Sequence, residues 1–262
     1  MKLVLNGHDE RYVVEQGMLN LFPGERPVYE PIGPGDDSWA VVTLREDDRC
    51  HVTVELCFRG KSLPYSLDVP LVGDEFQREG IRRRAIGKCF FLAARALTGH
   101  TPPWGMLTGV RPVKLPTRAL LSGATPLQAK QELREEYYVS PDRAALAVDC
   151  AQASIAAQRS LKEGEVSLYL GIPFCPTRCA YCSFVSADVG RTLTLVEPYV
   201  DALLKEIDGT ARVLTESGRT IRSFYMGGGT PTTLSARQLD RVLTRCEQVL
   251  PLEGCTELTV EA

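Results

Sequence analysis

Residues 166–182 read VSLYLGIPFCPTRCAYC, a short apolar run that leads at once into three closely spaced cysteines. Val166 to Leu170 has the length and composition of a buried β-strand. Cys175, Cys179 and Cys182 follow it in a Cys-x3-Cys-x2-Cys pattern. Three thiolates in such a run can hold three irons of a 4Fe-4S cluster and leave the fourth iron open for a ligand. The stretch therefore predicts a cluster-binding loop at the end of a strand.

A structural zinc site is the main alternative for these thiols. Zinc in such a site takes four ligands, most often as Cys-x2-Cys pairs, and the sequence holds no second pair of that kind. Cys246 or Cys255 would have to supply the fourth ligand, because the histidines, His8, His51 and His100, lie far upstream. In a reducing compartment the cysteines outside the run are expected to be buried thiols: Cys50, Cys57, Cys89, Cys150, Cys246 and Cys255.

Strand and helix patterns alternate from Val166 to the last residue. The expected elements are a helix that opens at Pro198 and ends near Gly218, a strand from Ile221 to Met226, a helix that begins at the capping box of Ser235 and Gln238 and ends near Leu250, and a strand from Thr256 to Val260. Helices of this length join parallel strands through right-handed crossovers. The pattern therefore predicts a parallel sheet.

Ligands of parallel sheets and barrels gather at the carboxyl ends of the strands. The cysteine loop, the run GGGTPT at residues 227–232 and Glu261 each follow directly on a predicted strand, so we expect them on one rim. The glycine run lacks the lysine of a P-loop. It is typical either of a tight turn or of a backbone wall whose N–H and C=O groups bind a polar ligand. Glu261 is either a ligand to an amine or ribose hydroxyl or a surface glutamate.

The first part of the chain predicts a separate α+β domain over residues 1–125. Its expected elements are antiparallel strands at Lys2 to Leu5, Trp39 to Arg45, His51 to Phe58 and Ser62 to Val69, covered by an amphipathic helix from Asp74 to Leu97 that Gly99 ends. Residues 126–162 are expected to be a helical linker, with helices from Pro126 to Tyr137 and from Pro141 to Gln158. Residues 163–262 would form the second domain.

Composition excludes several classes of protein. The net charge of −3 gives no basic surplus for nucleic acid, so the arginines at 82–84 are expected to form a solvated helix face. No apolar stretch approaches the roughly 20 residues of a membrane span, and the N-terminal apolar run is too short for a signal peptide. We expect a cytoplasmic protein.

Taken together, the motifs resemble the radical S-adenosylmethionine (SAM) enzymes, and among them the oxygen-independent coproporphyrinogen III oxidase group. The resemblance rests on residues 169–182 (YLGIPFCPTRCAYC), on residues 226–232 (MGGGTPT) and on Glu261. Residues 103–112 (PWGMLTGVRP) also look like the coproporphyrinogen dehydrogenase-like subgroup with an extra N-terminal domain. The implied fold is α/β, an N-terminal α+β domain followed by the first half of a radical SAM partial (β/α)6 TIM-like barrel.

The resemblance also implies cofactors, a reaction and the residues that serve them. These residues are cluster ligands at Cys175, Cys179 and Cys182, contacts to a SAM on the open iron at Tyr169, Gly228 and Glu261, and contacts to a second SAM at Tyr181, Gly229 and Thr230. No catalytic side chain is assigned beyond the cluster. In the implied reaction, reductive cleavage of SAM starts the oxidative decarboxylation of coproporphyrinogen III to protoporphyrinogen IX in haem synthesis. The partners would be this porphyrinogen and an electron donor.

Departures from the family pattern leave the substrate open. The oxidases of the group have a histidine at the position of Gly171 and a further cysteine at the position of Phe184. Both differences recur in relatives that do not decarboxylate, including haem-binding chaperones, so a haem-delivery protein is the alternative function. Family barrels also have more strand-helix units than the three strands predicted here. The chain is therefore expected to be a fragment that is inactive alone.

Overall fold

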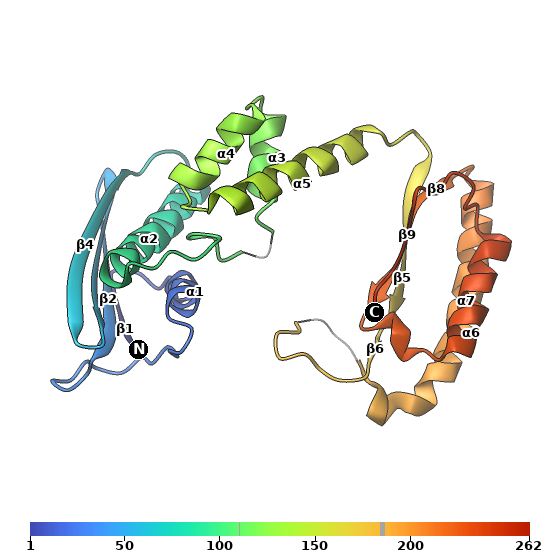
Figure 1. The fold of residues 1–262 in the computed structure, drawn as a ribbon, viewed down its shortest axis with the longest axis horizontal. Coiled ribbons are helices and arrows are strands. Elements are labelled where there is room, and N and C mark those ends of the chain that lie inside the picture. The colour runs from blue at the N-terminus through green and yellow to red at the C-terminus, as the bar shows by residue number, and fades with distance from the viewer. Residues whose placement is uncertain (110, 184–186) are drawn as a thin grey trace. The chain divides into compact units, whose positions relative to one another are not determined.

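A computed structural model describes residues 1–109, 111–183 and 187–262. The chain divides into two compact units, residues 1–156 and 157–262, which are described separately (Figure 1). Phe184, one of the two positions that depart from the family pattern, lies outside the described residues, as does Val110 of the segment 103–112.

The first unit contains a four-stranded sheet in the order β1-β2-β3-β4. Its strands are β1 (Lys2–Asn6), β2 (Ser38–Glu46), β3 (Arg49–Phe58) and β4 (Lys61–Pro70). The last three pair antiparallel, but β1 runs parallel to β2, so the prediction of a wholly antiparallel sheet is wrong. A parallel pair needs a crossover connection, and the helix α1 (Arg11–Leu21) lies in that connection.

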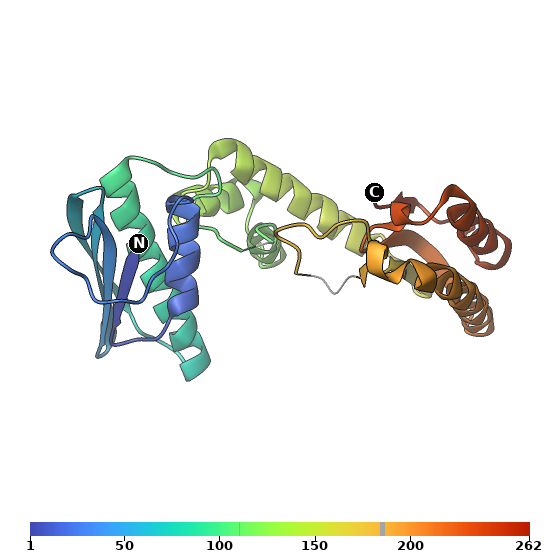
Figure 2. The same cartoon turned by 90° about the horizontal axis from the view of Figure 1, so that it is seen from below.

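Helices α1 and α2 (Glu75–Thr98) lie side by side over the sheet (Figure 2). The sequence predicts α2 and its end at Gly99, which lies in the left-handed region with φ +69°; the structure adds a capping box of Asp74 and Gln77 at its start. It does not predict α1, which begins without a side-chain cap. Strand and helix residues share one core, which includes Leu3, Val42, Val54, Leu56, Met18, Ile86, Phe90 and Phe91.

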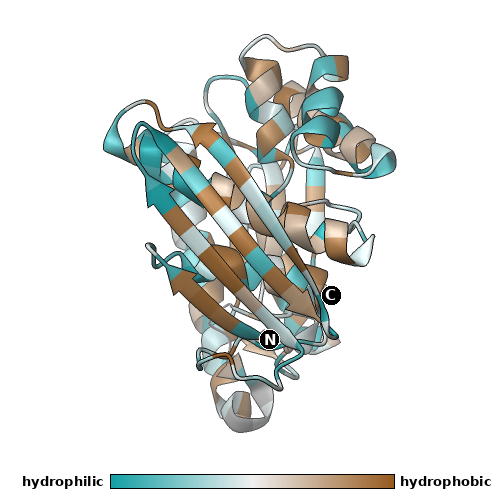
Figure 3. Cartoon of the chain, turned by 90° about the vertical axis from the view of Figure 1, so that its left-hand side faces the viewer, coloured by the Kyte–Doolittle hydropathy of each residue, from teal (hydrophilic) through white to brown (hydrophobic). Residues whose placement is uncertain are grey.

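Figure 3 looks onto the sheet of this unit, along whose strands hydrophilic and hydrophobic residues alternate. Thr53, Ser66 and Asp68 are polar positions that alternate with the core residues. On α2, Arg82 pairs with Glu46 and Glu75, and Arg83 pairs with Glu10 and Glu79. These carboxylates neutralise two of the three arginines, and Arg83 and Arg84 are exposed, in agreement with the expected solvated helix face.

Three further helices complete the first unit: α3 (Lys114–Leu121), α4 (Pro126–Glu135) and α5 (Pro141–Arg159). The predictions of α4 and α5 are confirmed to within about two residues, the usual uncertainty of helix ends. The sequence does not predict α3, because it contains Pro116 and proline usually interrupts a helix. Here the proline lies in the first turn, where it costs the helix no hydrogen bond. None of the helices in the described ranges is long and apolar enough to cross a membrane.

The second unit is an α/β structure in which three parallel strands have the order β5-β8-β9. The strands are β5 (Glu165–Ile172), β8 (Thr220–Gly228) and β9 (Glu257–Val260), joined by α6 (Val189–Glu216) and α7 (Ala236–Val249). Both helices lie on the same side of the sheet (Figure 1). Each strand neighbours the next in the chain, as in a TIM-like barrel and unlike a doubly wound sheet, whose order reverses. The predicted α/β fold, a partial TIM-like barrel, is confirmed.

The start of α6 differs from its prediction. Pro198 was expected to open the helix, because proline is favoured in the first turn, but α6 begins at Val189 and contains Pro198. Its backbone departs from helical geometry at Thr192, with φ −120° and ψ 17°. Pro198 therefore follows a break in the helix, and the expected start is wrong by several residues.

The core of the second unit lies between the sheet and its two helices. It includes Leu170 and Ile172 of β5, Phe224 and Met226 of β8, Val200 and Ile207 of α6, and Val242 and Cys246 of α7. The predicted capping box of Ser235 and Gln238 begins α7. Arg241 pairs with Glu197 and Asp201, and Arg245 with Asp208, so ion pairs join the outer sides of α6 and α7.

The strand β9 presents apolar side chains that the core does not cover. Leu258 and Val260 are in register with the buried Phe224 and Met226, which places them on the helix-facing side of the sheet. They nevertheless expose 67% and 44% of their surface. Exposed apolar residues on an edge strand favour pairing with another chain.

We predict that Leu258→Lys makes the 262-residue chain less prone to self-association, because a charge on an edge strand opposes strand pairing. Leu127→Lys is the matched control, since Leu127 is 66% exposed but lies on α4. Sedimentation velocity over a range of concentrations measures the effect. Equal self-association of both variants and the unmodified chain would contradict the prediction.

Candidate cluster and cofactor site

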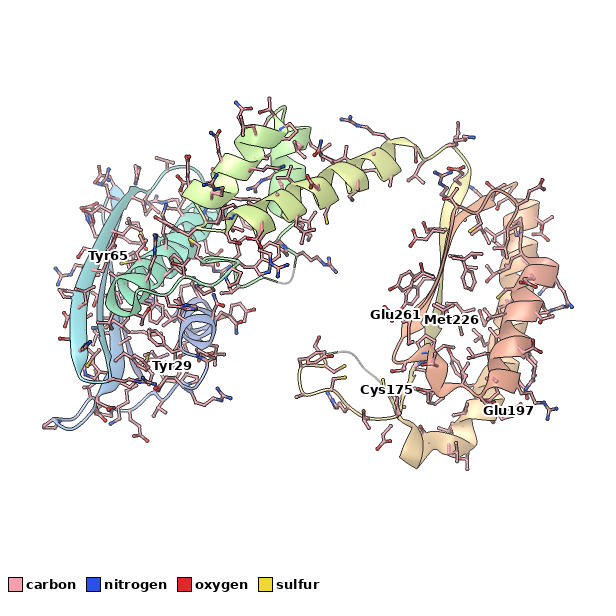
Figure 4. The ribbon with its side chains drawn as sticks, viewed as in Figure 1. Tyr29, Tyr65, Cys175, Glu197, Met226 and Glu261 are labelled. Carbon is pink, nitrogen blue, oxygen red and sulfur yellow. The ribbon has the colours of Figure 1, made fainter. Side chains whose placement is uncertain are left out.

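The carboxyl ends of the three parallel strands bring the predicted site elements to one edge of the second unit. The cysteine loop follows β5, the glycine run ends β8, and Glu261 follows β9. Parallel pairing sets Gly171 beside Gly227, and the Glu261 N–H donates to the Met226 carbonyl at 2.9 Å. Figure 4 shows Cys175 and Glu261 on this part of the chain, with Met226 toward the helices.

The glycine run is hydrogen-bonded to the backbone that leads into Cys175. The Gly229 N–H donates to the Ile172 carbonyl and the Thr230 N–H to the Phe174 carbonyl, both at 2.7 Å. The Thr230 hydroxyl lies 3.7 Å from the Cys175 sulfur, within range of an O–H···S hydrogen bond. These two N–H groups are therefore engaged within the protein. The sequence left two interpretations of the glycine run, a tight turn or a backbone surface that binds a polar ligand. On the second interpretation, these two N–H groups are not available to the ligand.

Steric contacts explain the glycines of this run. A Cβ on Gly229 would lie 2.5 Å from the Phe174 carbonyl oxygen and 3.0 Å from the Cys175 sulfur. Gly228 has φ +113°, a conformation that side chains rarely adopt, and its Cβ would lie 3.0 Å from the Ile172 oxygen. Only glycine lets the run approach the cysteine strand this closely.

Glu261 is held at the same edge by a tyrosine. The Tyr225 hydroxyl donates to Glu261 Oε1 at 2.6 Å, and the carboxylate raises the pKa of that hydroxyl. The Tyr225 ring stacks on the Tyr169 ring, with centroids 5.9 Å apart and planes at 12°. Sequence reasoning missed Tyr225. Its signal was the alternation of β8, which sets Ser223, Tyr225 and Gly227 on the side opposite the core.

The three cysteines of the run are free thiols that the structure leaves accessible. Cys175 and Cys182 are half-buried, and Cys179 is exposed. The Cys182 N–H donates to the Cys179 carbonyl at 3.0 Å, which forms a turn. Tyr181 is 88% exposed, and the Cys179 sulfur raises the pKa of its hydroxyl.

The described part of the chain holds no group of three or more His, Cys, Asp or Glu side chains close enough to share a metal ion. The cysteine run therefore supplies three thiol ligands of the kind a cluster needs, but their sulfur atoms are not gathered around one point. Figure 1 shows that residues 176–183, which follow β6 (Phe174–Cys175), extend away from the sheet. Three accessible thiols fit an iron-sulfur cluster, and metal binding commonly orders its own loop.

Neither proposed fourth ligand for zinc lies at this edge. Cys246 is buried in the core on α7, and burial raises the pKa of its thiol to about 11. Cys255 precedes β9 and so lies at the amino end of the strands, opposite the cysteine loop. Neither Cys246 nor Cys255 therefore lies where it could complete a zinc site with the cysteine run.

The remaining cysteines largely agree with their expected place in the core. Cys50, Cys57 and Cys89 are buried in the first unit, and burial raises the pKa of Cys89 to about 12. Cys150 on α5 is exposed, so the expectation of a buried thiol is wrong there, and Cys255 is only half-buried. All nine cysteines are free.

The chain is similar in sequence to known proteins of the coproporphyrinogen oxidase-like group. No family model matches the chain. The whole chain aligns, at 31% identity over 270 residues, with the oxygen-independent coproporphyrinogen-III oxidase-like protein HemZ of Bacillus subtilis and covers 54% of it. The homologues of this chain are coproporphyrinogen oxidase-like radical SAM proteins. The resemblance recognised in the sequence is confirmed.

Other relatives match a smaller part of this chain. The Heme chaperone HemW of Lactococcus lactis is 41% identical over 96 residues, 37% of this chain and 23% of that protein. The radical SAM coproporphyrinogen III oxidase HemN of Escherichia coli, a solved structure, is 29% identical with a TM-score of 0.32, over 42% of this chain and 25% of that one. The chain spans about half the length of HemZ and less of the others.

We predict that Gly229→Ala lowers the free energy of unfolding by about 1–3 kcal/mol, because the new methyl group overpacks the contact with Phe174 and Cys175. Gly209→Ala is the control. Gly209 lies in α6, and no atom apart from the backbone of its own helix lies within 4 Å of its Cβ position, so alanine there should stabilise the protein by about 0.4–1 kcal/mol. Urea unfolding measures both. Equal stability of Gly229→Ala and the unmodified protein would contradict the packing argument.

Proposed function

We propose that this chain carries the cluster-binding and SAM-binding region of an anaerobic radical SAM oxidoreductase that converts coproporphyrinogen III to protoporphyrinogen IX. The observation that carries the proposal is the hydrogen-bonded contact between the glycine run and the strand of Cys175, on the same sheet edge as Glu261. The alignment of the whole chain with HemZ supports it.

In this proposal the thiols of the run hold a 4Fe-4S cluster, and the neighbouring backbone and side chains hold SAM. The assigned residues are Cys175, Cys179 and Cys182 for the cluster, Tyr169, Gly228 and Glu261 for one SAM, and Tyr181, Gly229 and Thr230 for a second SAM. The chemistry these bound groups supply is a one-electron cleavage of SAM that yields a hydrogen-abstracting radical. An electron donor and a reducing, cytoplasmic compartment belong to the same proposal.

The contribution of the chain's own residues is placement. The Thr230 hydroxyl and the backbone beside Gly229 orient the Cys175 sulfur. Glu261 is acceptor-only when ionised and suits an amine or ribose hydroxyls. Its Oε1 is bound by Tyr225, so Oε2 is the atom that would accept from SAM.

A haem-delivery protein is the second candidate function. The 41% identity with HemW over the aligned segment favours it, as do the departures at Gly171 and Phe184. A Cβ at Gly171 would meet only Tyr169 Cε1, at an ordinary 3.5 Å, so packing leaves room for a side chain there. The glycine at this position therefore needs an explanation other than packing.

Turnover separates the two functions. The full-length protein, reconstituted anaerobically with iron and sulfide, is mixed with SAM, dithionite and coproporphyrinogen III, and in parallel with haem. The proposed oxidase gives vinyl-porphyrinogen product together with methionine and 5′-deoxyadenosine. Stoichiometric haem binding without product would contradict the oxidase and support the delivery protein.

We predict that Cys179→Ser removes most of the iron and sulfide that the reconstituted protein retains, because a cluster ligand is lost. Cys150→Ser is the matched control, since Cys150 is also an exposed thiol but lies on α5 outside the run. Metal and sulfide analysis after gel filtration measures the effect. Full retention in Cys179→Ser, or bound zinc without sulfide in the unmodified protein, would contradict the cluster assignment.

A further inference from the structure

The sheet face opposite the helices of the second unit carries a layered set of polar and aromatic side chains. Strand register sets Ser167 beside Ser223, then Tyr169 beside Tyr225, then Gly171 beside Gly227. On the third strand, Glu257 and Thr259 continue the first two of these layers. The tyrosine layer thus lies directly before the glycines and Glu261 at the carboxyl edge.

Tyr225 contacts Glu261 and Tyr169, two of the side chains that the proposed function assigns to SAM binding. Tyr225 itself has no role in that proposal. Its hydroxyl donates to Glu261 Oε1 at 2.6 Å, and its ring stacks on Tyr169. Tyr169 remains 60% exposed, so its other side is available to a ligand. One side chain therefore supports both an aromatic surface and a carboxylate.

Gly227 makes this arrangement fit. A Cβ there would lie 2.8 Å from Glu261 Oε2 and 2.9 Å from Tyr225 Cε1. Both side chains pack over the bare backbone of this residue, which narrows the positions that the Glu261 carboxylate can take. The tyrosine hydroxyl then fixes Oε1, and Oε2 stays beside the Gly227 backbone.

We infer that Tyr225 is a positioning residue for SAM, which holds the Glu261 carboxylate and the Tyr169 ring in the geometry that receives the ligand. The inference rests on the proposed function, because it takes Glu261 and Tyr169 as SAM contacts. Tyr225 acts through these two residues and need not touch SAM.

The test uses Tyr225→Phe, which removes the hydroxyl and keeps the ring, in the full-length protein with its cluster assembled. Losing a hydrogen bond to a charged group should weaken SAM binding by about 10-fold, measured by equilibrium dialysis. KM for SAM should rise by a similar factor, while kcat at saturating SAM falls by less. Ser223→Ala is the control, since Ser223 lies on the same strand and face and its hydroxyl donates to Ser167.

A double-mutant comparison shows whether Tyr225 acts through Glu261. Tyr225→Phe should weaken SAM binding in the unmodified background and add little in the Glu261→Ala background, because the carboxylate it positions is gone. A purely structural role would give the same loss in both backgrounds and a matching loss in Ser223→Ala. Cluster absorbance and the unfolding midpoint confirm that each variant is folded and loaded.

The outcomes separate this inference from the proposed function. Unmodified protein that holds its cluster and binds no SAM would overturn the proposed function, and the inference with it. Unmodified protein that binds SAM, with Tyr225→Phe binding equally well, would overturn the inference alone. Additive losses in the two backgrounds would also overturn it.

Discussion

The contact between the glycine run and the strand of Cys175 is the constraint on which the proposed site depends. Two backbone hydrogen bonds, from Gly229 to Ile172 and from Thr230 to Phe174, continue the pairing of β5 and β8 beyond the regular strands. They bring the Thr230 hydroxyl to the Cys175 sulfur. A Cβ at Gly229 would lie 2.5 Å from the Phe174 carbonyl oxygen and 3.0 Å from this sulfur, which is too close for either contact. The first cysteine of the run is therefore held against the sheet.

The two faces of the parallel sheet carry different kinds of side chain. One face supplies Leu170, Phe224 and Met226 to the core beneath α6 and α7. The opposite face presents serines, tyrosines, glycines and carboxylates in register across the strands. Successive side chains of a strand point to opposite faces of the sheet. The same strands therefore supply apolar side chains to the core and polar side chains to the other face. The same face holds the stacked tyrosines and the carboxylate that the proposed SAM site requires.

Much of this arrangement could be predicted from the sequence, because strong local signals mark it. The apolar strand runs, the capping box at Ser235 and the helix end at Gly99 locate their elements to within a few residues. The parallel β1 was not predictable from local pattern, since its pairing is set by a partner more than thirty residues away. Helices α1 and α3 were missed where a cap is absent or a proline lies in the first turn.

The candidate site was predictable in its motifs and less so in its contacts. Spacing identified the cysteines and the strand ends identified the common edge. Neither could show that Tyr225 bonds Glu261, because that contact joins neighbouring strands far apart in the chain. The proline signal at Pro198 misplaced the start of α6, since the helix breaks before it at Thr192. Long-range packing, which one sequence does not display, decides such details.

Electron paramagnetic resonance of the reduced, reconstituted full-length protein, recorded with and without SAM, tests the central claim most directly. If the three cysteines leave one iron open beside Glu261 and the glycine run, SAM should bind that iron and change the g values of the reduced cluster. A cluster signal that saturating SAM leaves unchanged would contradict the account.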